Sequence, residues 1–374
     1  MTQSLVITPL DNSLGARVTL PGGITDPSKL SDEHFRQLYE ALHTHLVLVI
    51  PHQSKLPASS QFELTKRFDP SCVGNYGHSK DILSHKKNIL KHDLNSVPSQ
   101  PQVQILGYGK HYNHEGVKEL NLAHPVHDTF HKDVLTDEEK AAGQTRFYRW
   151  HIDAALYALS PPVATTLLGI EVPPSDKVQK IVYKDTKEEL NLTQASTCFV
   201  SGQTAFELLS DEDKKLALET TVVYPPHPFI YISDAKASSD GLVIESEGKE
   251  LPFSELPPWE ESKIKRFPMV WTNPVTGKQH LQIAGCAVYQ LERNGETIQL
   301  EEARKEVHRL MRPAISPQHV YAHSWKPGDL VIFFNRGVWH SVTGHFEEGD
   351  TRLMHQCNIS SGEDPIFERT PGIF

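Results

Sequence analysis

Residues 325–340 read WKPGDLVIFFNRGVWH and contain a turn, a strand and a second turn in direct succession. Lys326, Pro327 and Gly328 combine the residues that favour a tight turn. The run 329–334 is almost continuously apolar, which predicts a strand buried on both faces. Gly337 indicates a second turn, which would present His340 at the start of the next strand. This stretch therefore predicts a sheet protein with a histidine placed at the start of a strand.

Similar short elements recur along the whole chain. Apolar or alternating runs predict further strands at 46–50, 102–106, 146–153, 165–172, 196–200, 268–270, 280–283 and 352–359. Amphipathic patterns predict helices at 26–44, 59–68, 206–218 and 301–311, with Ser31 as the N-cap of the first. The 26 prolines argue against a helical bundle. Many short strands with a few helices predict a mainly β fold, a double-sheet jelly roll with added helices.

The chain shows no linker and no internal repeat, so a single domain is expected over residues 1–374. Residues 111–143 are rich in His, Asp, Glu and Lys without clear periodicity, and we interpret them as a long loop. We therefore expect residues of about 107–145 to form a lid inserted into this domain.

Composition narrows the class of protein. The formal net charge is −10 and no Lys/Arg run stands out, which argues against a nucleic-acid surface. No secretory leader and no apolar stretch of roughly 18–20 residues is found, so no membrane attachment is expected. The four cysteines are far apart and are interpreted as free thiols of a cytoplasmic protein. A small-molecule ligand is expected, and the oligomeric state is left open.

Three His-x-Asp/Glu matches occur, and 21 His with 47 acidic residues in 374 positions give about 2.6 by chance. Two of them, beginning at His131 and His345, lie in polar segments and are interpreted as solvated charge. His151 and Asp153 instead follow an aromatic run, where strand alternation places both side chains on one face. The simpler alternative is a core histidine bonded to its neighbouring carboxylate.

Two downstream residues favour a metal site over that alternative. His340 would complete a set of two imidazoles and one carboxylate, the facial triad of non-haem Fe(II) oxygenases. Arg352 follows twelve residues later and could bind the distal carboxylate of a 2-oxo acid. Its alternative role is a structural ion pair with Asp329 or Glu347.

These segments, in this order, resemble the taurine/2,4-D dioxygenase family of Fe(II)- and 2-oxoglutarate-dependent oxygenases. The resemblance covers most of the chain and rests on residues 150–153, 197–207, 268–277 and 325–340. It implies a double-stranded β-helix with His151, Asp153 and His340 as the iron ligands and O₂ and 2-oxoglutarate as co-substrates. It further implies that Arg352 and Thr197 bind the distal 2-oxoglutarate carboxylate and that Trp325 lines its pocket.

Within the family, the chain looks most like the fungal xanthine dioxygenases, through residues 146–157, 259–265 and 356–358. That resemblance implies hydroxylation of xanthine to uric acid in purine catabolism, with release of succinate and CO₂. Sulfonate-cleaving relatives place a second arginine where this chain has Gln356. An amide offers a donor and an acceptor, which suits the lactam edges of a purine.

Further substrate contacts are expected from amides on two strands. Asn358 follows Gln356 on the same strand face, and Gln102 and Gln104 share a face of another strand. Ordinary strand-face polarity is the alternative for Gln102 and Gln104. Ala123 stands where a lysine is plausible in the subfamily, and Glu138 and Glu139 are only loosely placed near the purine.

Three other functions remain open from the sequence. The same chemistry could act on a sulfonate, alkyl sulfate or aryloxy acid, although Gln356 argues against an anionic substrate. A zinc hydrolase could use the same three ligands, but it gives no role to Arg352 or Thr197. A non-catalytic jelly-roll binding protein would need neither the triad nor the arginine.

Overall fold

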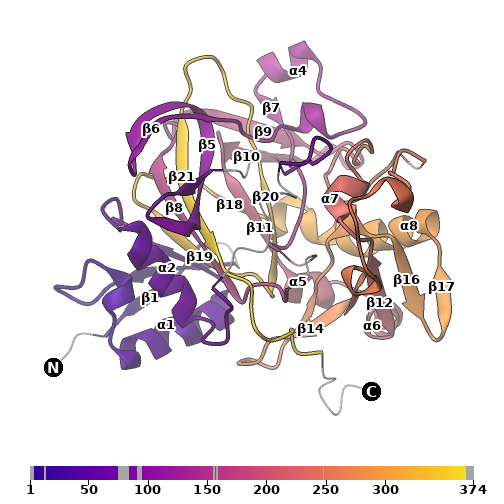
Figure 1. The fold of residues 1–374 in the computed structure, drawn as a ribbon, viewed down its shortest axis with the longest axis horizontal. Helices are drawn as coiled ribbons and strands as arrows, with labels where there is room; N and C mark the ends of the chain where they lie inside the picture. Colours follow the sequence, from indigo (N-terminus) through magenta and orange to yellow (C-terminus); the bar gives the residue numbers. More distant parts are fainter. Residues whose placement is uncertain are drawn as a thin grey trace.

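The computed structural model describes residues 4–11, 14–74, 84–90, 95–154, 156, 159–246 and 248–367. Two facing sheets form its centre, and helices are added outside them (Figure 1). Ala155 and Tyr157, which belong to the range 146–157 used for the resemblance, lie outside the described residues, as do residues 368–374 of the predicted domain. No helix in the described ranges is long and apolar enough to cross a membrane.

The larger sheet contains nine strands in the order β1-β2-β3-β19-β8-β21-β5-β4, with β6 paired to β5. At its centre, β8 pairs antiparallel with both β19 and β21, and β21 pairs in turn with β5. The bounds are β1 Val6–Pro9, β2 Ala16–Thr19, β3 Val47–Ile50, β4 Ser96–Val97, β5 Gln100–His114, β6 Val117–Leu122, β8 Ala164–Glu171, β19 Leu330–Phe334 and β21 Arg352–Asn358. The last strand of the chain is thus inserted between two strands from much earlier in the sequence.

The second sheet contains β18 (Tyr321–His323), β11 (Thr197–Ser201) and β20 (Val338–Val342), with β11 in the middle. Phe199 of β11 packs on Phe333 of β19 with ring centroids 5.3 Å apart, so the two sheets face each other. Every residue of β19 and of β11 is buried, so both strands are covered on both faces. This is the predicted jelly roll, and the predicted fold class is confirmed.

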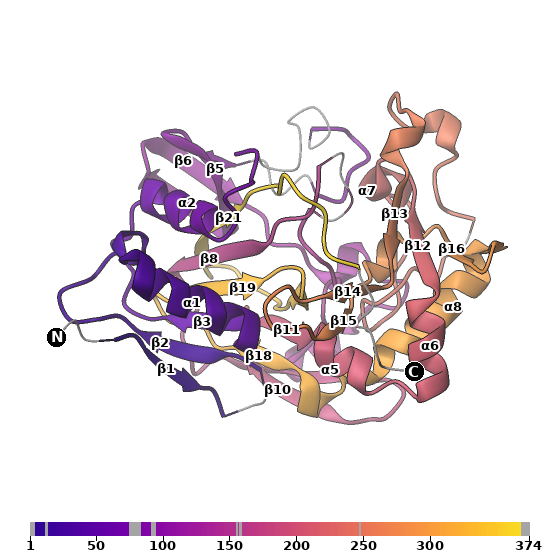
Figure 2. The same ribbon diagram turned by 90° about the horizontal axis from the view of Figure 1, so that it is seen from below.

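Two helices cover the outer face of the larger sheet, α1 (Asp32–His45) and α2 (Ala58–Arg67) (Figure 2). Ser31 caps α1 as predicted, because its side chain accepts a hydrogen bond from the His34 N–H. Gln61 of α2 donates to the carbonyl oxygens of Thr166 and His355, which lie on neighbouring strands of the sheet. These bonds hold α2 across β8 and β21.

A second group of elements packs on the other side of the molecule and shares a core with the residues around 147–152. Its helices are α5 (Gly202–Glu207), α6 (Asp211–Leu218), α7 (Pro228–Tyr231) and α8 (Leu300–Met311). Its strands are β12 (Thr220–Tyr224), β13 (Lys265–Pro268), β14 (Val270–Thr272), β15 (Gln279–Leu281), β16 (Gln290–Arg293) and β17 (Glu296–Ile298). A small sheet of β7 (Gln144–Thr145), β9 (Val178–Val182) and β10 (Glu189–Thr193) completes the fold, with α4 (Asp137–Ala141) beside it.

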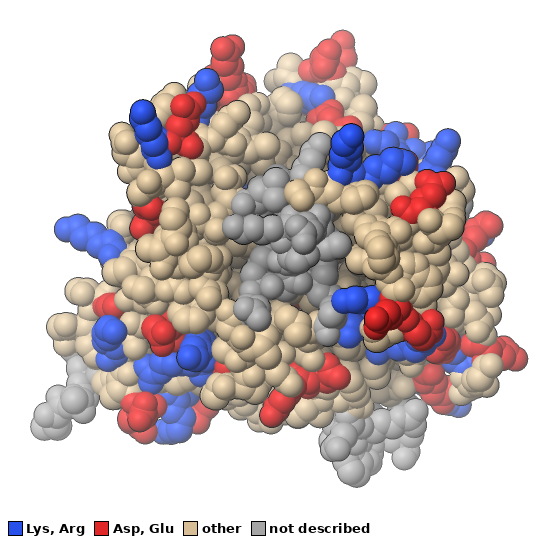
Figure 3. Space-filling view, viewed as in Figure 1, with Lys and Arg blue, Asp and Glu red and all other residues tan. Residues whose placement is uncertain are grey.

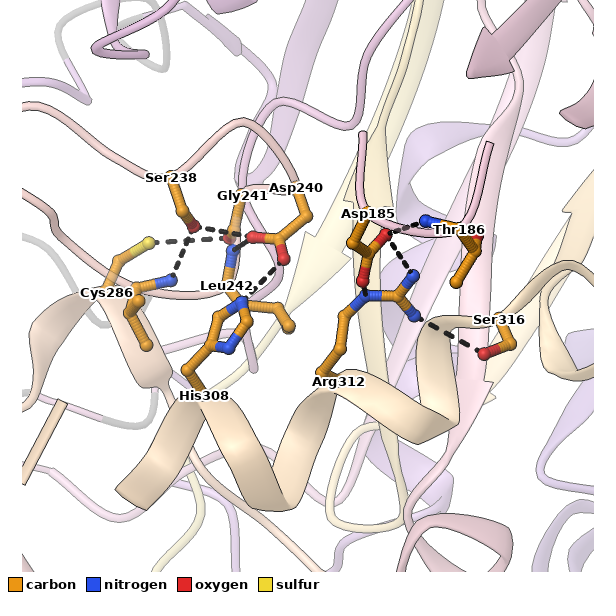
Figure 4. Close-up of polar contacts among 11 residues, drawn as sticks. Asp185, Thr186, Ser238, Asp240, Gly241, Leu242, Cys286, His308, Arg312 and Ser316 are labelled. Carbon is orange, nitrogen blue, oxygen red and sulfur yellow. Dashed lines mark hydrogen bonds and ion pairs between the residues drawn. The ribbon is translucent and has the colours of Figure 1, made fainter. Parts of the chain in front are cut away.

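A short loop, residues 238–242, connects this second group to the centre (Figure 4). His308 of α8 donates to Asp240 Oδ2 at 2.8 Å, and Asp240 Oδ1 accepts from Ser238 Oγ. The Gly241 carbonyl accepts from the Trp150 N–H at 3.0 Å, one residue before His151. A side chain at Gly241 would lie about 3.2 Å from backbone oxygens of residues 147 and 148, so glycine allows this close approach.

Two predictions of local structure were wrong. Residues 111–143 are not one long loop, because β5 continues to His114 and turns through Glu115 and Gly116 into β6. Most side chains of this hairpin end are exposed or half-buried, so the apolar periodicity that would have revealed it is weak. Residues 146–153 form no regular strand, although His151 bridges His340 through two backbone hydrogen bonds.

Positive and negative side chains are interspersed on the face of the molecule seen in Figure 3. Surface ion pairs include the one between Arg312 and Asp185, which Figure 4 shows. Pairs of this kind contribute little to stability, typically ~0–1 kcal/mol.

Candidate metal and substrate site

The structure brings His151, Asp153 and His340 together between the two sheets. Both Nε2 atoms lie 3.6 Å from Asp153 Oδ1, and the three ligand atoms fit within 4.8 Å of one another. His340 comes from β20, while His151 and Asp153 come from the extended segment that pairs with it. The arrangement is a facial set of two imidazoles and a carboxylate, so the chemistry of the donor set fits Fe(II).

Both imidazoles direct Nε2 toward Asp153 Oδ1, and a hydrogen bond fixes the tautomer of His151. The Nδ1 atom of His151 lies 3.1 Å from the Arg149 carbonyl, which can only accept, so Nδ1 carries the proton and Nε2 has a free lone pair. Burial lowers the pKa of His151 well below its ordinary value, and the charges of His340 and Arg149 lower it further. Burial also lowers the pKa of His340. Neutral imidazole is the form that binds metal.

The carboxylate of Asp153 is oriented by its second oxygen. Oδ2 accepts from Thr165 Oγ1 at 2.9 Å and from Gln356 Nε2 at 3.2 Å, which leaves Oδ1 directed toward the histidines. The side chain of Asn335 accepts from the Asp153 N–H and donates to the Asp153 carbonyl. Bonds of this kind fix the orientation of a metal ligand.

Arg352 lies at the start of β21, buried, with Nη1 3.3 Å from His124 Nδ1. Burial lowers the pKa of Arg352 to about 10. The alternative pairing is not seen, because no ion pair joins Arg352 to Asp329 or Glu347 among the described residues, and Asp329 faces His323 instead. Gly107 allows β5 to pass beside it, since an added Cβ would overlap the Arg352 carbonyl. A buried guanidinium without a carboxylate partner favours an anionic ligand.

Thr197 and Trp325 act as a pair. Trp325 Nε1 donates to Thr197 Oγ1 at 3.1 Å, and both side chains are buried. Thr197 lines the same cavity as Arg352 and the three metal-ligand candidates, whereas Trp325 is not among the residues that line it. Trp325 therefore lies behind Thr197 and orients its hydroxyl, instead of lining the pocket as the resemblance implied.

The four amides predicted to contact substrate separate into two pairs. Gln356 and Asn358 of β21 line the cavity. Gln102 and Gln104 of β5 do not. Gln104 lies opposite Gln356 in the strand register but is covered there, and Gln102 accepts from Gln100 Nε2. Glu138 and Glu139 belong to the short helix α4 and do not line the cavity either.

Sequence reasoning missed several residues of the cavity wall. Arg149, Phe229 and Leu90 line it together with Tyr148, Ile152 and Ala154. Arg149 lies within the aromatic run and two residues before His151, which is a signal that could have found it. Phe229 lies in α7, far from the motif in sequence, and no local pattern identifies it.

The other histidine clusters have simpler explanations. His131 is buried, not solvated as predicted, and donates from Nε2 to the Tyr148 carbonyl at 2.8 Å, while Asp133 pairs with Lys184 at the surface. His114, Glu115 and His355 also bring three ligand atoms within 4.8 Å. The Nε2 atoms of His114 and His355 lie 2.8 Å apart, which is the distance of a direct hydrogen bond. Glu115 is exposed.

The chain belongs to the taurine catabolism dioxygenase TauD, TfdA family, whose model matches residues 7–358. An α-ketoglutarate-dependent xanthine dioxygenase of Emericella nidulans is 47% identical over 368 residues, which cover 97% of this chain and 98% of that protein. An enzyme of the same description from Neurospora crassa is 46% identical over 371 residues, covering 96% and 88%, respectively. That of Schizosaccharomyces pombe is 44% identical over 348 residues, covering 91% and 84%.

Solved structures support the fold. A taurine dioxygenase from Burkholderia xenovorans superposes with a TM-score of 0.59 at 16% identity, covering 97% of this chain and 93% of that one. A second structure, AAD-2 in complex with Mn(II) and N-oxalylglycine, gives a TM-score of 0.57 at 16% identity and covers 97% and 100%. At this level of identity, the likeness supports the shared jelly roll alone.

Proposed function

We propose that this protein is a 2-oxoglutarate-dependent dioxygenase that hydroxylates xanthine to uric acid, with release of succinate and CO₂. The observation that carries the reaction type is the triad of His151, Asp153 and His340 in one cavity with the buried Arg352. The identity of 44–47% with three fungal xanthine dioxygenases, over most of each chain, supports xanthine as the substrate.

The residues have separate roles in this proposal. His151, Asp153 and His340 would hold Fe(II), and Arg352 with Thr197 would bind the distal carboxylate of 2-oxoglutarate. Bound Fe(II) supplies the oxidative chemistry, which couples decarboxylation of 2-oxoglutarate to hydroxylation of the purine at C8. The protein orients both substrates and excludes water from a cavity with a largely apolar wall that includes Leu106, Leu167 and Met354. No side chain is needed as an acid or base.

Gln356 and Asn358 support a neutral or weakly acidic heterocycle over a sulfonate. Gln356 uses one amide hydrogen on Asp153, so its carbonyl and second hydrogen remain for a ligand. The Asn358 Oδ1 atom is buried without a hydrogen-bond partner in the described structure, which favours a ligand that donates to it. Purine N–H groups are donors of this kind.

The segment 107–145 is the proposed lid of a single domain that spans the chain. Gly107, Ala123, His124 and Pro125 line the cavity from this segment, and His124 contacts Arg352. Ala123 offers no cation to the substrate, so any charge that acts on the purine comes from elsewhere in the cavity.

The test is an assay of 2-oxoglutarate-dependent succinate release with a panel of purines, a sulfonate, an alkyl sulfate and an aryloxy acid. We expect xanthine to give uric acid and succinate in equal amounts, and only with Fe(II) and O₂ present. Turnover of another compound without a xanthine response would overturn the substrate and leave the reaction type intact. Hydrolysis of a substrate without O₂ would favour the zinc hydrolase instead.

A further inference from the structure

The cavity contains a second arginine, Arg149, whose guanidinium has no hydrogen-bond or ion-pair partner among the described residues. The side chain of Arg149 lines the cavity and the residue is only 5% exposed. No hydrogen bond or ion pair reaches its guanidinium from the part of the chain that the structure describes, and its Nε is buried without a partner. Burying an unpaired charge is costly, and so buried arginines are normally paired. A group that enters the cavity is therefore the expected partner.

The position of Arg149 is fixed by its surroundings. Its guanidinium lies over the ring of Phe229, 4.4 Å from the ring centroid. Its backbone N–H donates to Ser341 Oγ, and its carbonyl accepts from the His151 ring. The next residue, Trp150, donates to Gly241. The guanidinium is thus pre-positioned beside the metal ligands, which limits the entropy lost when it binds a ligand.

The carboxylates near the cavity do not neutralise this charge. Asp153 is the acidic residue that lines the cavity, and its two oxygens are used by the metal position and by Thr165 with Gln356. Arg352, on a different strand, already provides the cation for the distal carboxylate of 2-oxoglutarate. The cavity therefore has one cation more than its co-substrate tail requires.

We propose that Arg149 is a substrate-binding residue, which donates hydrogen bonds to an exocyclic oxygen of the purine while Phe229 packs behind the guanidinium. This inference rests on the proposed function and identifies a residue that recognises the substrate. A guanidinium donates through a planar fork and cannot accept, so it requires an acceptor such as a carbonyl oxygen or a deprotonated ring nitrogen. Xanthine offers both, whereas unsubstituted purine has no exocyclic oxygen and would leave Arg149 unpaired.

The experiment measures binding without turnover. Protein loaded with Mn(II) and N-oxalylglycine, an unreactive stand-in for the co-substrate, is titrated with xanthine by calorimetry. We expect Arg149→Met to weaken xanthine binding about 10- to 100-fold, the range for losing a hydrogen bond to a charged group. Arg149→Lys should restore part of the affinity. Unsubstituted purine should bind wild type weakly and bind Arg149→Met no worse.

A matched control is Arg67→Met, because Arg67 also lies over a phenylalanine ring, that of Phe35 at 4.1 Å, but not in the cavity. Its xanthine affinity should equal that of wild type. N-oxalylglycine binding to Arg149→Met should stay within about 2-fold of wild type, which also shows that the variant is folded.

The outcomes separate the two proposals. Equal xanthine affinity in wild type and Arg149→Met would overturn the role of Arg149 and leave the xanthine function standing. A loss of N-oxalylglycine affinity with xanthine affinity intact would assign Arg149 to the co-substrate instead. A wild-type protein that binds no purine would overturn the proposed function and this inference together.

Discussion

Gln356 Nε2 donates to Asp153 Oδ2 at 3.2 Å, so a residue of β21 that faces the substrate space also orients the carboxylate of the metal triad. Arg352 starts the same strand. One strand therefore connects the proposed co-substrate anchor, the metal carboxylate and the amides proposed to contact the purine. A change that displaces β21 should affect all three functions together.

Replacing Asp153 with alanine should abolish turnover, because two imidazoles alone hold a divalent ion weakly. Bound iron and 2-oxoglutarate-dependent succinate release are the measurements. Asp133→Ala is the matched control, since Asp133 belongs to another His-x-Asp match but pairs with Lys184 at the surface. An Asp153→Ala enzyme with full activity would refute the triad.

Replacing Gln356 with leucine should weaken iron retention by about 10- to 100-fold, the usual effect of losing a bond to a metal ligand. The KM for xanthine should rise as well, because leucine lacks the side-chain carbonyl and the second amide hydrogen that Gln356 offers to the substrate. Competition with a chelator measures the first effect, and steady-state kinetics measure the second. Gln203→Leu, at a helix position where the amide bonds Glu207, should change neither. Wild-type iron retention in Gln356→Leu would mean that the bond does not orient Asp153.

Replacing Trp325 with phenylalanine removes the donor to Thr197 Oγ1 while keeping a ring of similar shape. We expect the Kd for 2-oxoglutarate to rise about 3- to 10-fold, as for the loss of one neutral hydrogen bond. The KM for xanthine should change little. Trp259→Phe, which removes an indole N–H outside the cavity, is the control. An unchanged Kd would show that Thr197 needs no orientation by Trp325.

The Asp240–His308 pair should make stability depend on pH. The hydrogen bond to Asp240 raises the pKa of His308 above 6.5, so its stabilisation is complete below pH 6.5 and is lost as the pH rises through the raised value. Burial raises the pKa of Asp240, but His308 together with the hydrogen bonds from Ser238 and Leu242 lowers it to a net value below 3.8. The stabilisation from the Asp240 carboxylate is therefore lost only in acid. The pair should therefore contribute most between about pH 4 and 6.5.

His308→Gln should lower the Tm by roughly 1–2 °C at pH 5.5 and by less at pH 8.5, a small effect because the histidine is partly exposed. Thermal unfolding at the two pH values measures it. His319→Gln, which lacks a carboxylate partner among the described contacts, should show no such difference. An equal loss of Tm at both pH values would mean that the charge of His308 does not matter.

The central buried strands and the longer helices could be predicted because their signals are local. The buried run of β19, the Ser31 cap of α1 and the helix α8 each follow from residues close together in the chain. The outer end of the β5–β6 hairpin was missed because most of its side chains are exposed or half-buried, which weakens the alternation that marks a strand. The metal triad could be predicted from ordered motifs, but Arg149 and Phe229 could not be recognised as one pair.

By itself, the sequence determined the central buried strands, the longer helices, the jelly-roll class and the three residues of the candidate metal centre. Only the tertiary structure decided which polar residues share the cavity. It places Gln356 and Asn358 in the cavity wall and Gln102 and Gln104 outside it, and it places Trp325 behind Thr197. Among the described residues, it also leaves the Arg149 guanidinium without a hydrogen-bond or ion-pair partner. The physical reason is that alternation along a strand fixes only the face of a side chain. Its neighbours depend on strand order and on which segments cover that face, and these come from distant parts of the chain.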